Sequence, residues 1–382
     1  MKKIKVMTVF GTRPEAIKMA PIIYSLQQHP DKFETIVTVT GQHREMLEQV
    51  MTAFKLSADY NLQVMQQNQT LSDITANVLQ KLEKLLQQVK PDIVLVHGDT
   101  TTTFAASLAT FYEKIPLGHV EAGLRTWNKY SPFPEEMNRQ LTDVLSDLYF
   151  APTKKSRENL LAQKISADKI FVTGNTAIDA LKQTVSEDYQ HETLTKIAPG
   201  QRLILLTMHR RENLGLPMKQ VFAAVNDVLH QDPTVEVIYP VHLNPKVQAL
   251  AQAAFADNPR VHLVKPLDVI DFHNLCAKSY FIMTDSGGVQ EEAPALGKPV
   301  LVLRDTTERP EGITAGTLKL VGTKRTVVAE MMQQLLAKDS KLYQTMAKAA
   351  NPYGDGHAAE RIIAAIEYYF KLEQQRPTDW IG

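Results

Sequence analysis

Residues 284–292 read Thr-Asp-Ser-Gly-Gly-Val-Gln-Glu-Glu and follow directly after an apolar run at 280–283. This order predicts a buried strand, a tight glycine turn and a helix that begins near Ser286. The first N–H groups of a helix lack partners within the helix, and the helix dipole makes this end positive. Such an end binds phosphate without a lysine, and Glu292 lies where it could accept the hydroxyl groups of an attached sugar. The segment indicates a phosphorylated, nucleotide-type sugar ligand; the other interpretation is an ordinary strand-to-helix turn.

A second segment with anion-binding chemistry follows the first apolar run of the chain, at 4–10. Gly11 permits a turn, and Pro14 suits the first position of a helix. Arg13 and Lys18 would then lie near the end of the strand, where arginine matches phosphate bidentately and lysine adds a point charge. The alternative is that both side chains only solvate the start of a helix.

Three carboxylates lie where they could perform general acid–base chemistry. Asp99 follows the predicted strand 93–97, where it would also suit the N-cap of the next helix. Glu121 ends the predicted strand 116–121, where helix capping explains a glutamate less well than it explains Asp99. Glu135 falls in the first turn of a predicted helix, which the helix dipole favours by itself. Because parallel strands end at one edge of a sheet, the two strand-end carboxylates could meet on one ligand.

Basic residues gather after two predicted strands in the second half of the chain. His209, Arg210 and Arg211 follow the strand that ends at residue 207, and together they suit a diphosphate clamp. A lone histidine at this place would more often be structural, so the interpretation depends on the neighbouring arginines. Arg304 and Arg309 follow the predicted strand 300–303 and lie near the expected sugar-phosphate site.

Short apolar runs alternate with longer amphipathic segments along the whole chain. The predicted strands are 4–10, 35–40, 93–97, 116–121, 148–151, 170–173, 202–207, 235–241, 261–264, 280–284 and 300–303. The predicted helices include 15–28, 71–89, 135–146, 218–230, 327–336 and 358–373. Alternating strands and helices predict parallel sheets that are covered by helices on both faces.

The strands are too many for one comfortable sheet, and 382 residues are too many for one ordinary core. The pattern is interrupted near 185–201 by polar residues and by Ala-Pro-Gly. We therefore expect two doubly wound α/β domains, at 1–175 and 176–365, with the segment 366–382 returning to the first.

Composition excludes several classes of protein. The 42 Lys and Arg residues balance 42 Asp and Glu residues, so nothing indicates nucleic acid or an anionic membrane as a partner. No apolar run approaches the roughly 18 residues of a membrane span, and no secretory signal is evident. The single cysteine, Cys276, fits a core position in a reducing compartment. A cytoplasmic protein is expected.

Neither a cofactor nor a metal is indicated. The segment Gly354-Asp355-Gly356 superficially matches a dinucleotide fingerprint, but no strand precedes it, so we interpret it as a loop and a helix start. The 11 histidines form neither a His-Glu-x-x-His motif nor a pairing with cysteine.

Seven segments together resemble the bacterial non-hydrolysing UDP-N-acetylglucosamine 2-epimerase family. They are residues 11–18, 97–99, 120–125, 134–139, 209–213, 285–293 and 304–311. The resemblance spans nearly the whole chain and implies the glycosyltransferase-B fold, in which two Rossmann-like domains face each other across a cleft, and a homodimer. It also implies interconversion of UDP-N-acetylglucosamine and UDP-N-acetylmannosamine for surface polysaccharide synthesis.

The resemblance assigns roles to individual residues. The positions that match the family's catalytic set are Asp99, Glu121, Glu135 and His209. The positions that match its nucleotide contacts are Arg13, Lys18, Phe272, Ser286, Gly287, Gly288, Glu292 and Arg309. A regulatory site for a second, activating UDP-N-acetylglucosamine is implied at Gln42, Gln69, Arg210 and His242.

The chemistry of this substrate favours elimination. The C2 proton is not next to a carbonyl, and no nicotinamide fingerprint supports oxidation at C3, so loss of UDP with the C2 proton is the economical route. It yields a 2-acetamidoglucal, to which UDP is added back. Three alternatives stay open: a retaining UDP-sugar glycosyltransferase of the same fold, a hydrolysing epimerase, and a catalytically idle UDP-sugar sensor.

Overall fold

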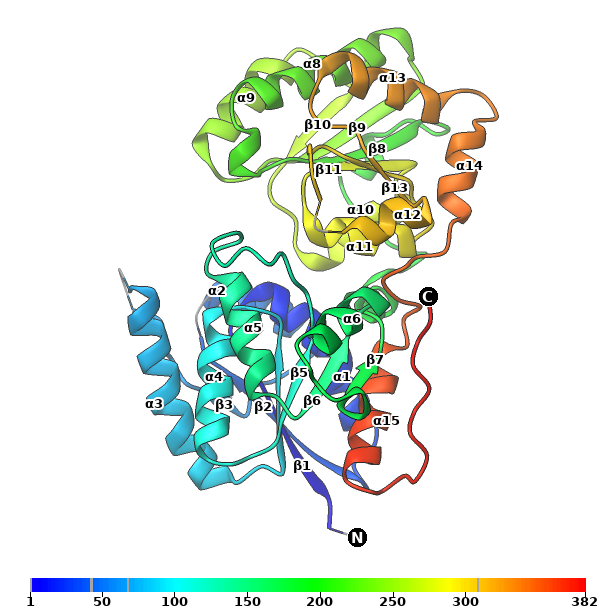
Figure 1. Ribbon diagram of the computed structural model, residues 1–382. Helices are drawn as coiled ribbons and strands as arrows, with labels where there is room; N and C mark the ends of the chain where they lie inside the picture. The colour runs from blue at the N-terminus through cyan, green and yellow to red at the C-terminus, as the bar shows by residue number, and fades with distance from the viewer. Residues whose placement is uncertain (1, 42–43, 67–68, 308) are drawn as a thin grey trace. The chain divides into compact units, whose positions relative to one another are not determined.

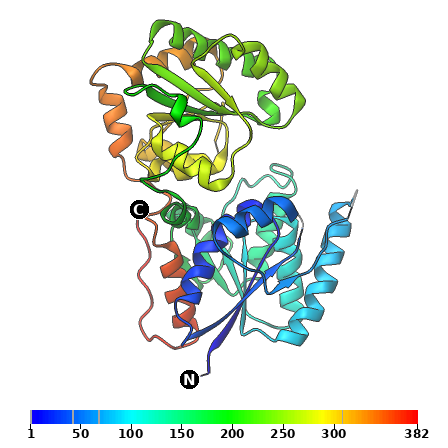
Figure 2. The same cartoon turned by 180° about the vertical axis from the view of Figure 1, so that it is seen from behind.

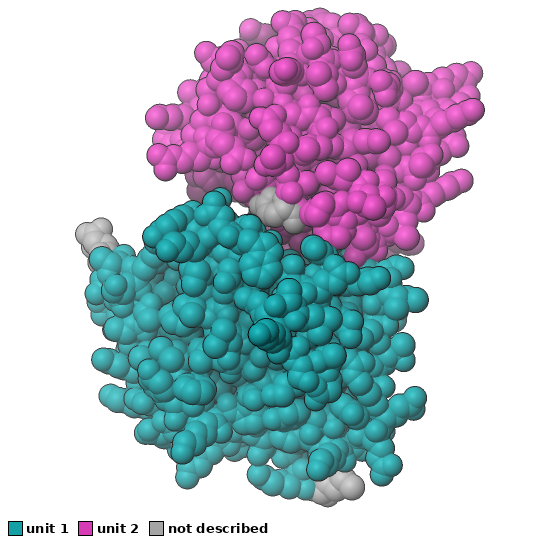
Figure 3. All heavy atoms as spheres, in the orientation of Figure 1, with its two compact units in different colours: residues 1–183, 353–382 teal, residues 184–352 magenta. Residues whose placement is uncertain are grey.

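The computed structural model describes residues 2–41, 44–66, 69–307 and 309–382, and the chain forms two compact units (Figure 3). Unit 1 consists of Met1–Gln183 and Tyr353–Gly382, and unit 2 consists of Thr184–Pro352. Each unit contains one sheet, and all the strand pairs recorded among the described residues are parallel. The α/β class with two doubly wound sheets is thereby confirmed.

Unit 1 contains a seven-stranded sheet in the order β3-β2-β1-β4-β5-β6-β7. Its strands are β1 (Ile4–Phe10), β2 (Phe33–Val39), β3 (Tyr60–Asn61), β4 (Ile93–His97), β5 (Leu117–Val120), β6 (Leu148–Ala151) and β7 (Ile170–Val172). Its helices are α1 (Arg13–Gln27), α2 (Arg44–Ala53), α3 (Leu71–Val89), α4 (Thr101–Tyr112), α5 (Glu135–Leu145), α6 (Lys154–Ala162), α7 (Thr176–Thr184) and α15 (Ala358–Tyr369), with a short 3-10 turn, η1 (Ala167–Lys169). Helices α3, α4 and α5 pack side by side on one face of the sheet, and α2, α1 and α15 on the other (Figures 1 and 2).

Unit 2 contains a six-stranded sheet in the order β10-β9-β8-β11-β12-β13. Its strands are β8 (Arg202–Thr207), β9 (Val235–Pro240), β10 (Val261–Val264), β11 (Phe281–Thr284), β12 (Val300–Val302) and β13 (Leu318–Leu320). Its helices are α8 (Leu216–Gln231), α9 (Pro245–Phe255), α10 (Val269–Lys278), α11 (Gly287–Ala295), α12 (Pro310–Ala315), α13 (Arg325–Leu336) and α14 (Lys341–Lys348), with 3-10 turns η2 (Leu194–Lys196) and η3 (Arg211–Asn213).

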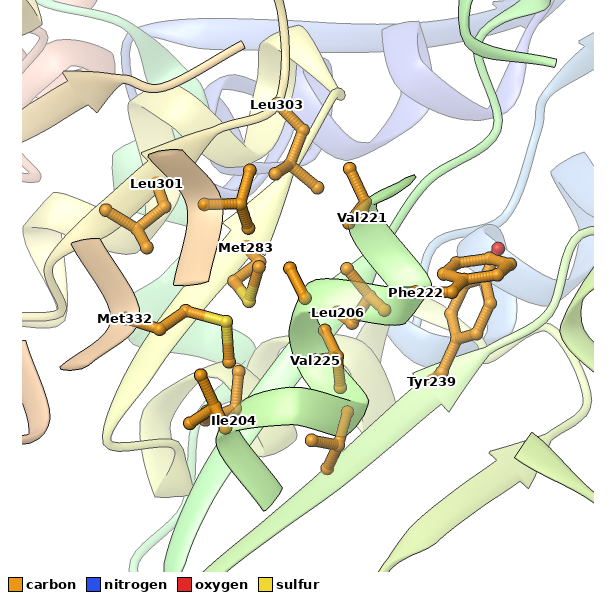
Figure 4. Packing of buried hydrophobic residues seen from close by; sticks show 14 of the residues in the cluster. Ile204, Leu206, Val221, Phe222, Val225, Tyr239, Met283, Leu301, Leu303 and Met332 are labelled. Atoms are coloured by element: carbon orange, nitrogen blue, oxygen red, sulfur yellow. The ribbon is translucent and has the colours of Figure 1, made fainter. Parts of the chain in front are cut away.

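Strand β8 shows why these apolar runs form buried strands. Successive side chains of a strand point to opposite faces of the sheet. Ile204 and Leu206 belong to one core together with Val225 of α8 (Figure 4). Leu203 and Leu205 pack into the core on the other face, which contains side chains of α10 and α11. Both faces are covered, so the strand is apolar at consecutive positions rather than at alternate ones.

The unit boundaries differ from the expected limits at 175 and 365, because α7, the segment before α15 and the whole of α15 belong to unit 1. Asn175 donates its backbone N–H to the carbonyl of Tyr353 at 2.7 Å. Asp179 of α7 accepts the backbone N–H groups of Ala358 and Ala359 at 3.2 and 2.8 Å, and so caps α15. The Gly354–Gly356 segment is a loop before α15, as the sequence indicated.

The last residues of the chain lie along β7, the edge strand of the first sheet. The N–H of Trp380 donates to the carbonyl of Val172 at 2.8 Å, and the N–H of Val172 donates to Asp379 at 2.9 Å. Arg376 donates to the carbonyl of Ile170 at 2.6 Å. This segment satisfies backbone groups that an edge strand would otherwise expose. Within the described residues, no helix is long and apolar enough to cross a membrane.

Candidate functional site

The three carboxylates predicted from the sequence lie at the carboxyl edge of the sheet in unit 1. Asp99 follows β4, Glu121 follows the neighbouring strand β5, and Glu135 is the first residue of α5. We call these three residues the carboxylate cluster. Asp99 and Glu121 follow strands that are hydrogen-bonded neighbours, and the charges of Glu121 and Glu135 both raise the pKa of Asp99.

Asp99 is held by two residues of α5. Arg139 donates to its carboxylate at 2.5 Å, and Asn138 donates to its backbone carbonyl at 2.9 Å. The alternative interpretation, that Asp99 caps the next helix, is wrong, because Thr100 is the N-cap of α4 and its side chain accepts the N–H of Thr103. The carboxylate of Asp99 is therefore not used for capping, and 27% of the side chain is exposed.

The electrostatic environment of Asp99 suits proton transfer. Burial raises its pKa, the charges of Glu121 and Glu135 raise it further, and Arg139 and Lys18 act in the opposite direction. The net result is a raised pKa. A carboxyl group whose pKa is raised towards neutrality can both give and accept a proton.

Glu121 has a backbone conformation that non-glycine residues rarely adopt, with φ at 67°. A left-handed residue of this kind persists only where its surroundings hold it, and such residues concentrate at functional sites. Its carboxylate is paired with Lys18 of α1 and accepts the side-chain amide of Asn175 at 2.9 Å. Lys18 lies at the expected edge of the sheet and also contacts a carboxylate of the cluster.

His97, to which the sequence analysis gave no role, is buried beside Glu121. Its Nε2 lies 3.8 Å from a carboxylate oxygen of Glu121, and the described residues give neither ring nitrogen a hydrogen-bond partner. Burial lowers the pKa of His97 to about 3, against the opposing charge of Glu121. The ring is therefore neutral at physiological pH.

Glu15 joins two of the turns at this edge and was also missed. Its carboxylate accepts the backbone N–H groups of Gly11 and Thr12 at 2.9 and 2.7 Å and the hydroxyl of Thr100 at 2.6 Å. The signal was present as the capping-box spacing Thr-x-x-Glu. Arg13 is the first residue of α1, so Pro14 is the second helical residue and not the first as expected.

The adjacent residues Glu135 and Glu136 have different environments. Pro134 occupies the N-cap of α5, and Glu135 at the first helical position is partly exposed. Glu136 is buried and accepts the backbone N–H groups of Thr126 and Trp127, each at 3.0 Å. Glu136 therefore holds the preceding loop, whereas Glu135 is available for a ligand.

In unit 2, the glycine turn after β11 forms what we call the anion cradle: Ser286, Gly287, Gly288 and Arg309. Ser286 is the N-cap of α11, and the two glycines open the helix with N–H groups that have no acceptor within it. Arg309 donates to Glu291 at 2.7 Å. A Cβ atom at Gly287 would lie 2.7 Å from Nη1 of Arg309, so only glycine lets this guanidinium approach the helix start.

Glu292 lies further along the same helix, beside His273 of α10. Their carboxylate oxygen and Nε2 are 3.6 Å apart, and Nδ1 of His273 lies 2.7 Å from the hydroxyl of Thr184. Phe272, the neighbour of His273, packs partly buried against the core on this face of the sheet. These residues place a carboxylate and an aromatic ring in the same unit as the anion cradle.

A buried carboxylate orders the loop after β8. Asp285 accepts the backbone N–H groups of His209 and Arg210, at 3.0 and 2.9 Å, and the side-chain amide of Asn213 at 3.0 Å. Burial lowers the pKa of His209, Asp285 opposes this, and His242 and Arg210 lower the pKa further. His209 is therefore neutral at neutral pH.

The residues of the implied regulatory site are distributed over both units. The rings of His242 and His209 stack, with centroids 5.7 Å apart, and Arg210 donates to the carbonyl of Asp285 at 3.0 Å. Gln69 belongs to unit 1, where its amide contacts backbone groups of its own loop. Gln42 lies outside the described residues.

Among the residues that the structure describes, no group of three or more His, Cys, Asp or Glu side chains could hold a metal ion. Cys276 is a buried free thiol, and burial raises its pKa well above the ordinary value. Its position fits the core, as expected, and does not favour a nucleophile.

Comparison with known proteins extends the resemblance found in the sequence. A family model described as UDP-N-acetylglucosamine 2-epimerase matches residues 25–367. The UDP-N-acetylglucosamine 2-epimerase of Bacillus subtilis is 57% identical over 382 residues, which cover 100% of both chains.

Solved structures agree with these matches. A putative UDP-N-acetylglucosamine 2-epimerase from Listeria monocytogenes is 56% identical with a TM-score of 0.95, over 100% of both chains. An epimerase from Neisseria meningitidis, solved with UDP-GlcNAc bound, is 50% identical with a TM-score of 0.86, over 95% of this chain and 99% of that one. With matches of this extent in sequence and in fold, the chain belongs to the UDP-N-acetylglucosamine 2-epimerase family.

Proposed function

We propose that the chain catalyses the reversible epimerisation of UDP-N-acetylglucosamine at C2, which yields UDP-N-acetylmannosamine for surface polysaccharide synthesis. The observation that carries the proposal is the carboxylate cluster, in which Asp99 has a raised pKa beside two further carboxylates. Epimerisation at an unactivated carbon needs such groups to remove and return a proton. The Neisseria relative, solved with UDP-GlcNAc, supports the choice of substrate.

The proposed route is elimination followed by re-addition. The bond between C1 and the diphosphate oxygen breaks while the C2 proton is transferred to a carboxylate, which gives 2-acetamidoglucal and UDP. A proton then reaches the opposite face of C2, and the diphosphate oxygen attacks C1 again. Asp99, Glu121 and Glu135 supply the proton-transfer groups of this route.

The anion cradle and the loop after β8 suit the other half of the chemistry. The departing diphosphate gains negative charge, which helix N–H groups and cations stabilise. Ser286, Gly287, Gly288 and Arg309 supply such groups in unit 2, and His209 can take up a proton when the anion is present. Arg13, Lys18, Phe272 and Glu292 are proposed as further contacts of the nucleotide sugar.

The experiment that tests this function is incubation with UDP-N-acetylglucosamine in deuterium oxide. Both epimers should form and carry deuterium at C2, as measured by NMR and mass spectrometry. Substrate labelled with ¹⁸O in the bond between C1 and the diphosphate should also scramble its label into the non-bridging oxygens. Epimerisation without scrambling would reject the elimination route, and retention of the original hydrogen would reject proton exchange at C2.

A retaining glycosyltransferase of the same fold is the alternative that the anion cradle alone would also suit. A transferase should consume the UDP-sugar only when an acceptor is added, whereas an epimerase needs none. The carboxylate cluster favours the epimerase, because group transfer does not require proton exchange at C2.

We also propose regulation by a second UDP-N-acetylglucosamine, bound at Gln42, Gln69, Arg210 and His242. The support is local to unit 2: Arg210 is next to His209 in the chain, and His242 stacks on the same residue. In the reverse direction, UDP-N-acetylmannosamine alone should react slowly, and a trace of UDP-N-acetylglucosamine should accelerate the reaction. An Arg210→Ala variant should lose this acceleration.

A homodimer is the assembly that we propose. Phe111, Tyr112, Leu141 and Val144 are exposed apolar side chains near the ends of α4 and α5, two helices that pack against each other. Such a cluster is typical of protein interfaces. Sedimentation should give the mass of two chains, and Val144→Lys should shift it towards one.

A further inference from the structure

A fully buried polar group near the carboxylate cluster is His119, the third residue of β5, which has no exposed surface. Its Nδ1 lies 2.6 Å from a carboxylate oxygen of Asp143, and its Nε2 lies 2.7 Å from the backbone carbonyl of Gly98. Neither contact was anticipated from the sequence. Both are short enough to be strong hydrogen bonds.

These two contacts determine where the hydrogens are. A carbonyl oxygen only accepts, so Nε2 of His119 must carry a hydrogen. Asp143 also accepts Arg125 at 2.5 Å, and although burial acts to raise its pKa, the charges of His119 and Arg125 lower it. An ionised carboxylate only accepts, so Nδ1 of His119 must carry a hydrogen as well. The ring is thus doubly protonated, with His97 and Tyr149 as the other titratable groups around the pair.

The pair links the turn that carries Asp99 to the next strand. Gly98 has φ at 68°, a conformation that favours glycine, and it precedes Asp99 directly. Its N–H donates to the carbonyl of Val120 at 2.9 Å, and its carbonyl accepts His119. Both backbone polar groups of Gly98 are therefore hydrogen-bonded to residues of β5.

Asp143 links the other two carboxylates to the same pair. It lies on α5, the helix that Glu135 begins. Its second oxygen accepts the N–H of Gly123 at 3.3 Å, two residues after Glu121. The elements that carry all three members of the carboxylate cluster therefore meet at one buried contact.

We infer that His119 and Asp143 are positioning residues, which hold the carboxylate cluster in place through a doubly protonated, buried imidazole ring. The positioning role rests on the proposed function, because it is defined by the reaction of the cluster. The protonation of the ring does not depend on the proposed function, and it can be measured without any substrate.

The first test is NMR of the full chain labelled with ¹⁵N at histidine, with the His119 signals assigned by their loss in His119→Gln. Both ring nitrogens should show the shifts of the doubly protonated ring in the buffer of the activity assay. An unprotonated nitrogen in that buffer would overturn the inference. In Asp143→Asn, Nδ1 should lose its hydrogen while Nε2 keeps its bond to Gly98.

The second test is the kinetics of His119→Gln. A glutamine amide has one donating and one accepting end, so it cannot donate to both Gly98 and Asp143. Displacement of reacting groups by about 1 Å costs roughly 100-fold in rate, so kcat should fall by about that factor with KM within about threefold. An unchanged kcat in a folded variant would overturn the positioning role.

A matched control is His262→Gln. His262 also lies 2.6 Å from a carboxylate, that of Glu236, but the two occupy the second positions of β10 and β9 in unit 2, away from the carboxyl ends of the strands. This variant should keep the kcat of the unsubstituted chain; an equal loss in both variants would show a general folding defect and overturn the specific role. Absence of epimerisation in the unsubstituted chain would reject the proposed function and the positioning role together, and the NMR result would still decide the protonation.

Discussion

Replacement of Gly287 by alanine should weaken the binding of UDP by displacing Arg309. The added Cβ would lie 2.7 Å from Nη1 and 2.8 Å from Cζ of Arg309, distances that folded proteins do not tolerate. The helix start can move little, because Gly287 is buried and only Asp285 and Ser286 separate it from the end of β11. The guanidinium must therefore move away from the N–H groups at the start of α11.

The size of the effect follows from the contacts that Arg309 would make with a diphosphate. A hydrogen bond between charged groups contributes about 1.5–3 kcal/mol. Since about 1.4 kcal/mol corresponds to a factor of ten, Gly287→Ala should raise the Kd for UDP by roughly 10- to 150-fold. Arg309→Ala should have an effect of the same size, because it removes the same group.

Isothermal titration calorimetry with UDP measures this without dependence on turnover. A double-mutant cycle gives the sharpest result: in the Arg309→Ala background, Gly287→Ala should add little, because the group that it displaces is gone. Additive losses would refute the reasoning, as would an unchanged Kd in Gly287→Ala alone. Gly288→Ala is the comparison, since its Cβ would lie 3.5 Å from Glu292, an ordinary contact, and its loss should be smaller.

Three further perturbations test unit 1. Arg139→Met removes a cation that lowers the pKa of Asp99, so the limb of the kcat/KM profile that reflects this group should move to higher pH. His97 stays neutral in the folded chain down to about pH 3, whereas in the unfolded chain it binds a proton below about pH 6.5. The free energy of unfolding should therefore fall as the pH falls below about 6.5. Urea unfolding should show a loss of about 2 kcal/mol from this group between about pH 7 and 5, and His97→Phe should remove it. Deletion of residues 374–382 should cost about 3 kcal/mol by calorimetry, at about 1 kcal/mol for each of the three hydrogen bonds to β7.

Each of these predictions has a control and a contrary result. Arg325→Met breaks an exposed ion pair with Asp227 in unit 2 and should leave the pH profile unchanged; an unmoved profile in Arg139→Met would contradict the electrostatic role. His230 is exposed, so His230→Phe should keep the pH dependence of stability that His97→Phe loses. Equal stability after the deletion would show that the terminal segment does not protect the edge of the sheet.

Local patterns predicted most of the secondary structure. The strands at Ile93–His97 and Arg202–Thr207 begin and end where expected, because a strand buried on both faces is a continuous apolar run. Two short strands, Tyr60–Asn61 and Leu318–Leu320, were missed, since segments of two or three partly exposed residues have no such run.

The place of the site was also accessible from the sequence, because parallel strands end at a common edge. That argument places Asp99 and Glu121 together from the sequence alone. It could not show that Thr100 caps α4 in place of Asp99, or that Glu136 is buried while its neighbour Glu135 is not. Both outcomes depend on the path of a loop, which propensity does not encode.

What the amino-acid sequence determined by itself is the order of strands and helices, the chemistry at the strand ends and the family. The tertiary structure decided which groups share a buried contact: His119 with Asp143 and Gly98, Asp285 with the loop after β8, and the last residues of the chain with β7. Hydrophobic period and capping propensity act over a few residues and leave a local pattern. Hydrogen bonds between residues 20 to 207 positions apart leave no local pattern, because a polar side chain finds such a partner only after the chain has folded.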